Sequence, residues 1–277
     1  MICTICPRAC DLEEGQTGYC MARANTGGLV ASVNYGAITS IALDPIEKKP
    51  LRRFFPGSFI LSVGSYGCNL HCPFCQNHRI SKTIPPEEHM TRISPEELAA
   101  HALRLVSQGN IGLAYTYNEP LVGYEVVLDT SRIIRSKGLK NVLVTNGMIC
   151  DKPLRSLLPF IDAMNIDLKG FTDEFYDWVF GSGLRGLETV KNTIITASKS
   201  CHVEVTILII PGKNDSEEEI RRLAKWLSEV DRRIPLHISR YHPDYRYFES
   251  PPSSIDRMER LAAVAAEYLD FVYKGNC

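Results

Sequence analysis

The sequence predicts an α/β protein built on a parallel sheet, preceded by a small cysteine-rich metal module. Two observations predict this fold: short apolar runs alternate with helical segments after residue 58, and four cysteines stand close together at the start. Strands that alternate with helices form parallel sheets with right-handed crossovers. We therefore expect a metal module with a linker over residues 1–58 and an α/β domain over residues 59–277.

The predicted metal module depends on a group of four cysteines among glycines, over roughly residues 1–28. So short and loop-rich a segment needs a bound metal to hold it together. Zinc and a second [4Fe-4S] cluster both suit four thiolates, and the spacing does not decide between them. Because four thiolates complete the shell, this centre is expected to be structural or to relay electrons. The four residues are Cys3, Cys6, Cys10 and Cys20.

Residues 29–58 are expected to form short strands and a link. The link carries a basic cluster, which we interpret either as a solvated segment or as a contact for an acidic partner or substrate. The cluster consists of Lys48, Lys49, Arg52 and Arg53.

Strands and helices alternate through the second part. Apolar runs of strand length predict six strands, followed by a last short one, at residues 59–63, 112–116, 141–145, 160–167, 203–210, 235–240 and 270–273. Apolar residues at helical spacing predict the intervening helices at residues 95–108, 121–136, from 152, at 186–199, around 220–230 and at 254–268.

Five polar clusters come at or just past the ends of these strands. The carboxyl ends of parallel strands meet at one edge of a sheet, where such proteins place their chemistry. We therefore expect the clusters to share one mouth. They are the cysteines of residues 68–75, Asn118-Glu119, Thr145-Asn146-Gly147, Asp167 with Lys169, and His242.

The first cluster is a C-x3-C-x2-C motif formed by Cys68, Cys72 and Cys75. A structural metal site closes its shell with four protein ligands, whereas a catalytic site keeps one position open. Three close thiolates indicate an iron–sulfur cluster with one iron free to bind another molecule. A zinc knuckle that borrows a distant fourth ligand is the alternative.

This motif, with the aromatic Phe74 before its last cysteine, resembles that of the radical S-adenosylmethionine (SAM) superfamily. The whole chain is similar to the pyruvate formate-lyase activating enzyme-related branch, including the radical SAM member of the AmmeMemoRadiSam system. The resemblance implies a partial (β/α)6 TIM-like barrel, a [4Fe-4S] cluster on the three cysteines, and SAM on the free iron. It also implies reductive cleavage of SAM to a 5′-deoxyadenosyl radical that abstracts hydrogen from a substrate.

The resemblance assigns SAM contacts to residues near the first two strands. Phe74 is expected at the adenine region, with packing inside its loop as the alternative. Where the family has Gly-Gly-Glu-Pro, this chain has Tyr117-Asn118-Glu119-Pro120. Asn118 and Glu119 are therefore expected near the SAM ammonium group, although the local backbone departs from the family pattern. A solvated loop carboxylate is the alternative for Glu119.

Asn165, Asp167 and Lys169 alternate with apolar residues, so their side chains share one strand face, which in a barrel is the interior. By resemblance, Asp167 and Lys169 help to hold the SAM carboxylate, with a surface ion pair as the alternative. Val144 stands where the activating enzymes have Asp, so direct pairing of Lys169 with the carboxylate is favoured over a bound cation.

Asn146 and His242 complete the predicted SAM site. The alternatives are an Asn-Gly turn for Asn146 and a structural role for His242. Further candidates to face the interior or the substrate are Glu204, Thr206, His237 and Ser239.

The leading interpretation is a radical SAM enzyme, in its specific form an activase that places a radical on a protein glycine. The implied partners are a protein or small-molecule substrate and an electron donor such as flavodoxin or ferredoxin. Dedicated activases of several glycyl radical enzymes carry a ferredoxin-like insert after the three cysteines of the C-x3-C-x2-C motif (the triad). In this chain the extra cysteines come before the triad. An enzyme that modifies a small molecule or another protein is therefore the alternative. A non-catalytic iron–sulfur redox scaffold is a second one.

Composition excludes several other classes. The net charge is −1 and no long basic run is present, so nucleic-acid binding is not expected. No apolar run is long enough to span a membrane. Ten cysteines without a secretion signal indicate a reducing compartment, and we expect a cytoplasmic protein. By resemblance, an open iron implies anaerobic conditions.

Overall fold

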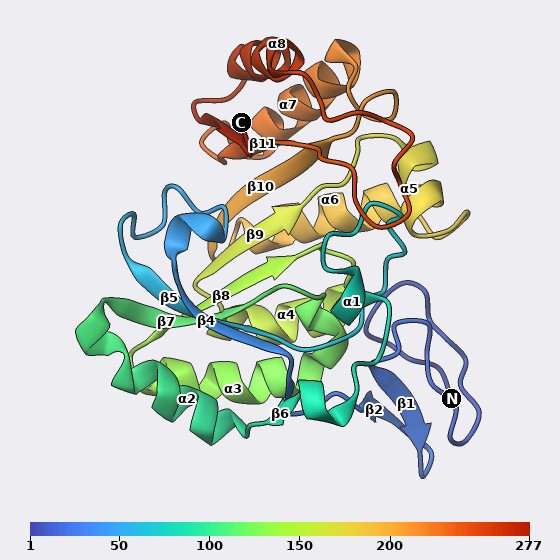
Figure 1. Cartoon of the computed structure of the whole chain (residues 1–277), viewed down its shortest axis with the longest axis vertical. Coiled ribbons are helices and arrows are strands. Elements are labelled where there is room, and N and C mark those ends of the chain that lie inside the picture. Colours follow the sequence, from blue (N-terminus) through green and yellow to red (C-terminus); the bar gives the residue numbers. More distant parts are fainter.

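The computed structural model describes all 277 residues and is organised around one curved eight-stranded sheet (Figure 1). Seven neighbouring strands are parallel, and the eighth, at one edge, is antiparallel to its neighbour. In spatial order the strands are β12 (Val272–Gly275), β11 (Leu236–Arg240), β10 (His202–Ile209), β9 (Ala163–Asp167), β8 (Lys140–Thr145), β7 (Asn110–Tyr115), β5 (Phe59–Gly64) and β4 (Ser40–Pro45).

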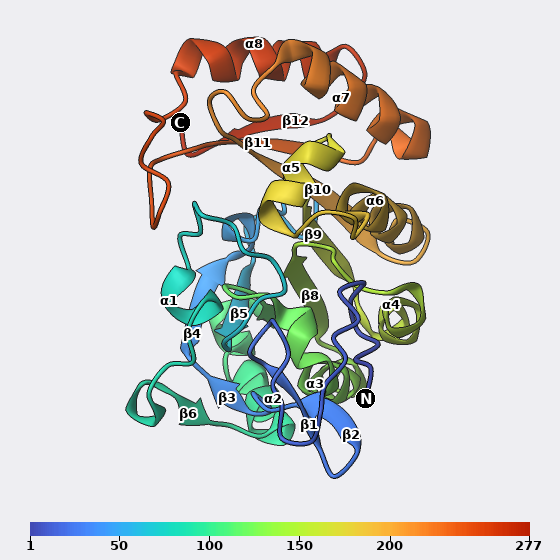
Figure 2. The ribbon, with the colours of Figure 1, turned by 90° about the vertical axis from the view of Figure 1, so that its right-hand side faces the viewer.

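Helices cover the outer face of this sheet (Figure 2). The covering helices are α2 (Pro95–Arg104), α3 (Tyr124–Ser136), α4 (Asp151–Leu157), α6 (Gly186–Ala197), α7 (Glu217–Asp231) and α8 (Ile255–Ala266). The shorter helices α1 (His78–Ser81) and α5 (Asp173–Val179) follow the ends of β5 and β9. Short 3-10 turns are η1 (Ile46–Lys48), η2 (Glu87–His89), η3 (Val106–Gln108), η4 (Pro120–Gly123) and η5 (Leu158–Phe160). No helix combines the length and apolar character that crossing a bilayer requires.

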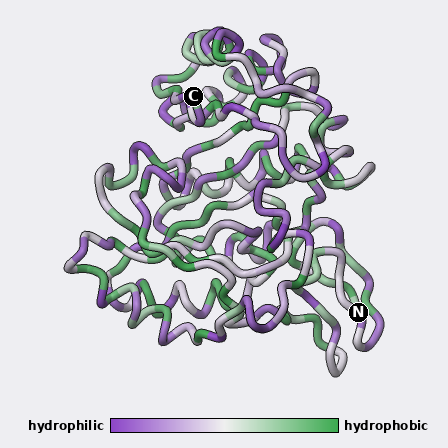
Figure 3. Tube along the Cα trace, in the orientation of Figure 1, coloured by the Kyte–Doolittle hydropathy of each residue, from purple (hydrophilic) through white to green (hydrophobic).

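Local sequence explains where several helices begin. Ser94 accepts a hydrogen bond from the backbone N–H of Glu97, whose side chain bonds back to Ser94, so α2 starts with a capping box. Ser216 and Ser254 cap α7 and α8 in the same way, each accepting from the backbone three residues later. The apolar faces of these helices join the inner strands in one main core of 50 buried residues. Figure 3 shows the hydrophobic segments concentrated along the central strands.

The N-terminal region lies against one end of the barrel (Figure 1). Residues 1–22 contain only isolated bridges, between Ile2 and Asp11 and between Thr17 and Ala24. A two-stranded hairpin follows, formed by β1 (Arg23–Thr26) and β2 (Leu29–Ser32). A second small pair joins β3 (Ala37–Ile38) to β6 (Thr91–Arg92). The start of the chain is therefore rich in loops.

The α/β architecture with six parallel strand–helix units is confirmed, and two strands extend it. β12 makes a seventh parallel strand, in register with β11. β4 lies within residues 29–58, which were expected to form short strands and a link, and it joins the main sheet by pairing with β5 from Ser40–Gly64 to Pro45–Phe59. Pro45 is tolerated because it ends a strand at the sheet edge, where no ladder hydrogen bond is lost. The charged and Pro-rich sequence after Asp44 hides this strand in the primary sequence.

Candidate active site

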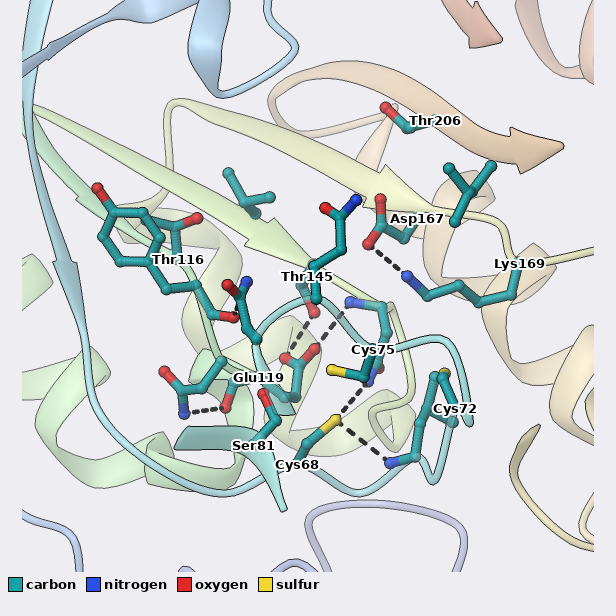
Figure 4. Close-up of a pocket in the computed structure, with 18 of the residues that line it drawn as sticks. Cys68, Cys72, Cys75, Ser81, Thr116, Glu119, Thr145, Asp167, Lys169 and Thr206 are labelled. Carbon is teal, nitrogen blue, oxygen red and sulfur yellow. Dashed lines mark hydrogen bonds and ion pairs between the residues drawn. The ribbon is translucent and has the colours of Figure 1, made fainter. Parts of the chain in front are cut away.

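A cavity of about 350 Å³ opens at the carboxyl ends of the parallel strands. Four of the strands contribute residues at or next to their ends, namely Thr116, Thr145, Asp167 and Ser239, and β10 contributes Thr206 from its second half. The loop between β5 and α1 supplies the opposite wall, and the Asp167–Lys169 pair faces it across the space (Figure 4). The expected convergence of strand-end clusters on one mouth is therefore present in the fold.

The three cysteines of the C-x3-C-x2-C motif all line this cavity. Two N–H groups point at the Cys68 sulfur: the Leu70 backbone at 3.4 Å and the Asn146 side chain at 3.7 Å. The approach to the motif requires glycine at position 67. Gly67 has φ of +92°, and a Cβ there would stand 2.5 Å from the Cys20 carbonyl oxygen. The loop is therefore fixed by both backbone conformation and close packing.

Glu119 joins the ends of β7 and β8. Its buried carboxylate accepts hydrogen bonds from the Thr145 hydroxyl (2.7 Å) and from the backbone N–H groups of Asn146 (2.8 Å) and Leu121 (3.0 Å). Burial raises the pKa of Glu119 to about 7, although these donors work in the opposite direction. Glu119 lines the cavity, as predicted, but its oxygens are first engaged in holding the two strand ends together.

Two asparagines hold the cysteine loop. The Asn118 side chain accepts from the Ser65 backbone N–H at 2.9 Å and donates to three carbonyls, including that of Gly67. Asn146 donates to the Asn69 side chain at 2.9 Å as well as facing Cys68. Both asparagines line the cavity, and both act on the loop that carries the cysteines. Asn118 and Asn146 therefore position the cysteine loop, in addition to the cofactor contacts that the sequence predicts for them.

Asp167 and Lys169 form an ion pair of 2.6 Å on the cavity wall, with both side chains partly exposed to it. Burial alone would lower the pKa of Lys169, but the Asp167 carboxylate outweighs this and raises it. The ammonium group therefore stays charged and lies where an anionic group in the cavity could meet it. Asn165, on the same face, lies deeper and bonds to Thr206 and to the Pro50 carbonyl instead of lining the cavity.

The position of Phe74 is compatible with both interpretations, a contact with the adenine of SAM and packing inside its loop. Its ring is buried against Phe175 and Trp178, with ring centroids at 6.3 and 5.5 Å, and it borders the cavity. An aromatic wall of this kind suits the flat face of an adenine.

His242 is not brought to the cavity. Its side chain is exposed, whereas the preceding Tyr241 is buried and donates a hydrogen bond to the Tyr247 carbonyl. Because Tyr241 takes the inward position after β11, the next residue turns outward. Among the further candidates, Thr206 and Ser239 line the cavity. Glu204 and His237 are bonded to each other in the interior and do not line it.

Lys48, Lys49 and Tyr117 line the cavity, although the sequence did not assign them to the SAM site. The Asp44 carboxylate accepts from Tyr117 and Lys49 at 2.9 Å each and from Lys48 at 3.2 Å. Tyr117 holds φ of +72°, a conformation that costs free energy for a residue other than glycine. The basic residues of the linker reach the cavity because β4 joins the sheet, and the unusual Tyr117 was the one local sign of this contact.

The four N-terminal cysteines line a second, smaller cavity, which shares no lining residue with the first. All four are free thiols. The structure thus brings Cys3, Cys6, Cys10 and Cys20 to one cavity, and the metal expected there stays a prediction.

Comparison with known sequences adds three findings. The model of the radical SAM superfamily matches residues 62–227, more than half of the chain. The chain is 43% identical over 277 residues to an uncharacterized protein of Methanocaldococcus jannaschii, which covers 99% of this chain and 80% of that protein. It is 24% identical over 216 residues to the pyruvate formate-lyase 1-activating enzyme of Escherichia coli K12, covering 73% of this chain and 86% of the enzyme.

Comparison with solved structures shows the same fold. A radical SAM methyltransferase from Sphaerobacter thermophilus superposes with a TM-score of 0.62 at 17% identity, covering 89% of this chain and 71% of that one. A domain of a pyruvate-formate lyase-activating enzyme from Bacteroides vulgatus gives a TM-score of 0.51 at 16% identity, covering 60% and 99%. At such identities the likeness concerns the fold.

Proposed function

The chain belongs to the radical SAM superfamily, and on that premise we propose that it is an activase-like enzyme that uses SAM to place a radical on a protein. One observation carries the proposal: three cysteines form one wall of an open cavity. Cys68, Cys72 and Cys75 are the only cysteines that line it, and no histidine does. Three thiolates suit a [4Fe-4S] cluster whose remaining iron is left for SAM.

A [4Fe-4S] cluster held by Cys68, Cys72 and Cys75 would supply the electron for reductive cleavage of SAM, and the radical chemistry that follows would remove hydrogen from the substrate. The chain's own residues hold and orient the reactants. The N–H groups of Leu70 and Asn146 face Cys68 and stabilise its thiolate. Gly67 and Asn118 keep the loop in place, so the cysteines need not reorganise on binding.

The chemistry of the cavity wall fits the amino-acid end of SAM. Lys169 presents an ammonium group to which a carboxylate can bind. Asp167, Glu119 and the strand-end carbonyls offer acceptors for the SAM ammonium group. The aromatic Phe74 then lies on the side left for the adenine. His242 would join this site only if the turn after β11 rearranged, so we leave it out of the proposed set.

The size of the cavity favours a macromolecular substrate. A volume of about 350 Å³ is at the lower end for ligand pockets. A cluster and SAM together occupy most of such a space, so the atom that gives up hydrogen must enter through the open mouth. An extended peptide segment reaches such a point readily. Relatives whose names describe them as activating enzymes also support a protein substrate. A low-potential electron donor of the flavodoxin or ferredoxin type completes the proposal.

The second candidate is a radical SAM enzyme acting on a small molecule. The pair Lys48 and Lys49 beside Tyr117 favours it, because these cations border the cavity and suit an anionic substrate. The four N-terminal cysteines add a second metal centre under either candidate.

SAM cleavage is tested first. The anaerobically purified protein is mixed with SAM and dithionite, and 5′-deoxyadenosine is quantified by mass spectrometry. We expect product from the unchanged protein and from the control Cys201→Ala, whose thiol lies outside both cavities, and none from Cys68→Ala. Product at the normal rate from Cys68→Ala would overturn the assignment.

The substrate class is tested with an extract of cells grown in heavy water. The extract is separated by dialysis into macromolecules and small molecules, and each fraction is added to the reaction. Deuterium in 5′-deoxyadenosine only with the retained fraction supports a protein substrate. Deuterium only with the dialysable fraction supports the small-molecule candidate and contradicts the activase.

A further inference from the structure

Three basic residues from distant parts of the chain meet at the cysteine loop, residues 68–75. The N-terminal segment, the region of α1 and the loop after β11 supply one each, and these segments lie together on one side of the barrel (Figure 1). Each residue is hydrogen-bonded to a different backbone carbonyl of the cysteine loop. The bonds run from the Arg8 guanidinium to Asn69 at 3.4 Å, from the Lys82 ammonium to Leu70, and from the Arg246 backbone N–H to Pro73 at 2.9 Å.

His71 lies among these cations. It is exposed and directly precedes Cys72, which is buried. Burial lowers the pKa of His71, the positive charges of Lys82, Arg246 and Arg8 lower it further, and none of the charges that act on the ring is negative. The surface over the cysteine loop is therefore positive, although the whole chain has a net charge of −1. We call Arg8, His71, Lys82 and Arg246 the basic patch.

Aromatic rings hold the basic patch in place. The Arg8 guanidinium lies 3.6 Å from the centre of the Tyr19 ring, and Tyr19 meets His71 edge-on at 6.1 Å between ring centres. The Arg246 guanidinium lies 5.0 Å from the ring centre of Tyr245, which stacks on the first residue of α1 at 4.5 Å. Arginine and tyrosine are enriched where proteins bind one another. The patch therefore combines an ordered positive charge with residue types that are typical of an interface.

The basic patch meets the cysteine loop from outside the cavity of the candidate active site. Leu70 and Cys72 line that cavity, whereas His71 between them is exposed and does not. Of the basic patch, Lys82 alone borders the cavity. A protein bound at the patch would therefore lie beside the triad and leave the mouth of the cavity free for the substrate.

From this arrangement we infer that the basic patch docks the electron donor, and that this donor is an acidic electron-transfer protein with carboxylates around its redox cofactor. One electron passes from the reduced donor to the oxidised cluster on the triad, and no proton or covalent bond is transferred. Complexes for electron transfer bury little surface, and complementary charges speed their association. An acidic substrate protein would also be attracted to the patch, but it has to deliver its reacting atom to the cavity. The inference deepens the proposed function and rests on its cluster, but not on the identity of the substrate.

The test measures electron transfer between the full-length, iron-loaded protein and a purified acidic flavodoxin, without SAM. The protein is photoreduced with deazariboflavin and mixed with oxidised flavodoxin, because the same docked complex carries the electron in either direction. Stopped flow then follows the flavin semiquinone, and any transfer that remains in Cys68→Ala is subtracted. The readout is the second-order rate constant at low ionic strength.

We expect Arg246→Glu, which reverses one charge of the basic patch, to lower this rate constant by roughly tenfold. Arg246→Gln only removes the charge and should have a smaller effect. The control Arg104→Glu reverses an exposed charge in the last turn of α2, at the end of the sheet where β7 begins, and should match the unchanged protein. Oxidation by benzoquinone, a small uncharged molecule that needs no docking, should be equally fast in all variants.

A second measurement needs no variant. Salt screens the attraction between exposed charges, so the rate constant of the unchanged protein should fall as the ionic strength rises, and that of Arg246→Glu should fall less steeply. A rate constant that does not depend on salt would overturn the inference even if Arg246→Glu failed to bind iron.

Three further outcomes would contradict docking at the basic patch. Arg246→Glu that exchanges electrons with flavodoxin at the normal rate would show that the donor binds elsewhere. Slower oxidation of this variant by benzoquinone as well would show that Arg246 acts on the cluster itself. Normal transfer to flavodoxin combined with loss of the deuterium signal from the macromolecular fraction would assign the patch to the substrate. Because SAM is absent from the transfer assay, a chain that exchanges electrons normally but never cleaves SAM refutes only the proposed function.

Discussion

Glu204 lies at the other end of the barrel from the cavity, and it fixes the segment that follows β4. Its carboxylate is completely buried and accepts four hydrogen bonds. Two come from the backbone N–H groups of Arg52 (3.0 Å) and Arg53 (2.7 Å). The others involve the Nε2 atoms of His202 (2.9 Å) and His237 (2.5 Å). We expect Glu204→Gln to release this segment, because an amide cannot accept from all four groups.

The pKa of Glu204 gives the magnitude. Burial alone would raise it, but the histidine and backbone donors outweigh burial and lower it from 4.5 to about 2. A shift of this size corresponds to about 3 kcal/mol of folding free energy. Because the folded-state pKa is the lower one, this stability is fully present above pH 4.5 and is lost as the pH falls toward 2. For a chain of this size the melting temperature should fall by roughly 6 to 12 °C at neutral pH.

The assay compares denaturant unfolding of the unchanged protein, Glu204→Gln and a control at several pH values. The control is Glu229→Gln, since Glu229 is exposed and makes no hydrogen bond or ion pair. We expect the free energy of unfolding of Glu204→Gln to be about 3 kcal/mol lower than that of the unchanged protein at pH 7, and this difference to become smaller below pH 4.5. A gap below 1 kcal/mol, or one that stays constant into acid, would refute this reasoning.

Three further predictions concern the cavity. Lys169→Met should weaken SAM binding by roughly 10- to 100-fold, because one charge-assisted hydrogen bond is lost, and the iron content should stay unchanged. Equal SAM affinity of the variant and the unchanged protein, measured by calorimetry, would contradict the contact. Gly67→Ala should lower iron content and stability together, because the new Cβ meets the Cys20 carbonyl; a fully loaded variant in an iron assay would show that the loop adapts. Lys49→Met should destabilise the fold by about 3 kcal/mol in thermal melts, because Asp44 loses its buried ion-pair partner. The control Lys48→Met removes an exposed cation and should cost under 1 kcal/mol.

Much of the barrel could be predicted because local signals and tertiary structure agree there. Apolar strands, capped helices and strand-end polar residues each follow from short-range patterns, and the parallel arrangement follows from their alternation. The triad, Glu119, Asp167 and Lys169 were found in this way and line one cavity. Their predicted contacts with SAM remain predictions.

The remaining features depend on long-range contacts that no local pattern contains. Short strands were expected within residues 29–58, but the pairing of β4 with β5 is a long-range contact, so the approach of Lys49 to the cavity could not be predicted. The position of His242 depends on Tyr241 taking the buried place in the turn. The unpaired Nε of Arg23 lies at the cavity lined by Cys3, Cys6, Cys10 and Cys20, which only the folded chain forms.

The central claim is that the triad holds a cluster with one iron open to SAM. Electron–nuclear double resonance of the reduced protein tests it most directly, with SAM isotopically labelled in its amino and carboxylate groups. We predict that both labels couple to the cluster spin in the unchanged protein and that neither does in Cys68→Ala. A fully iron-loaded, reduced protein whose spectrum shows no coupling to either label would contradict the account.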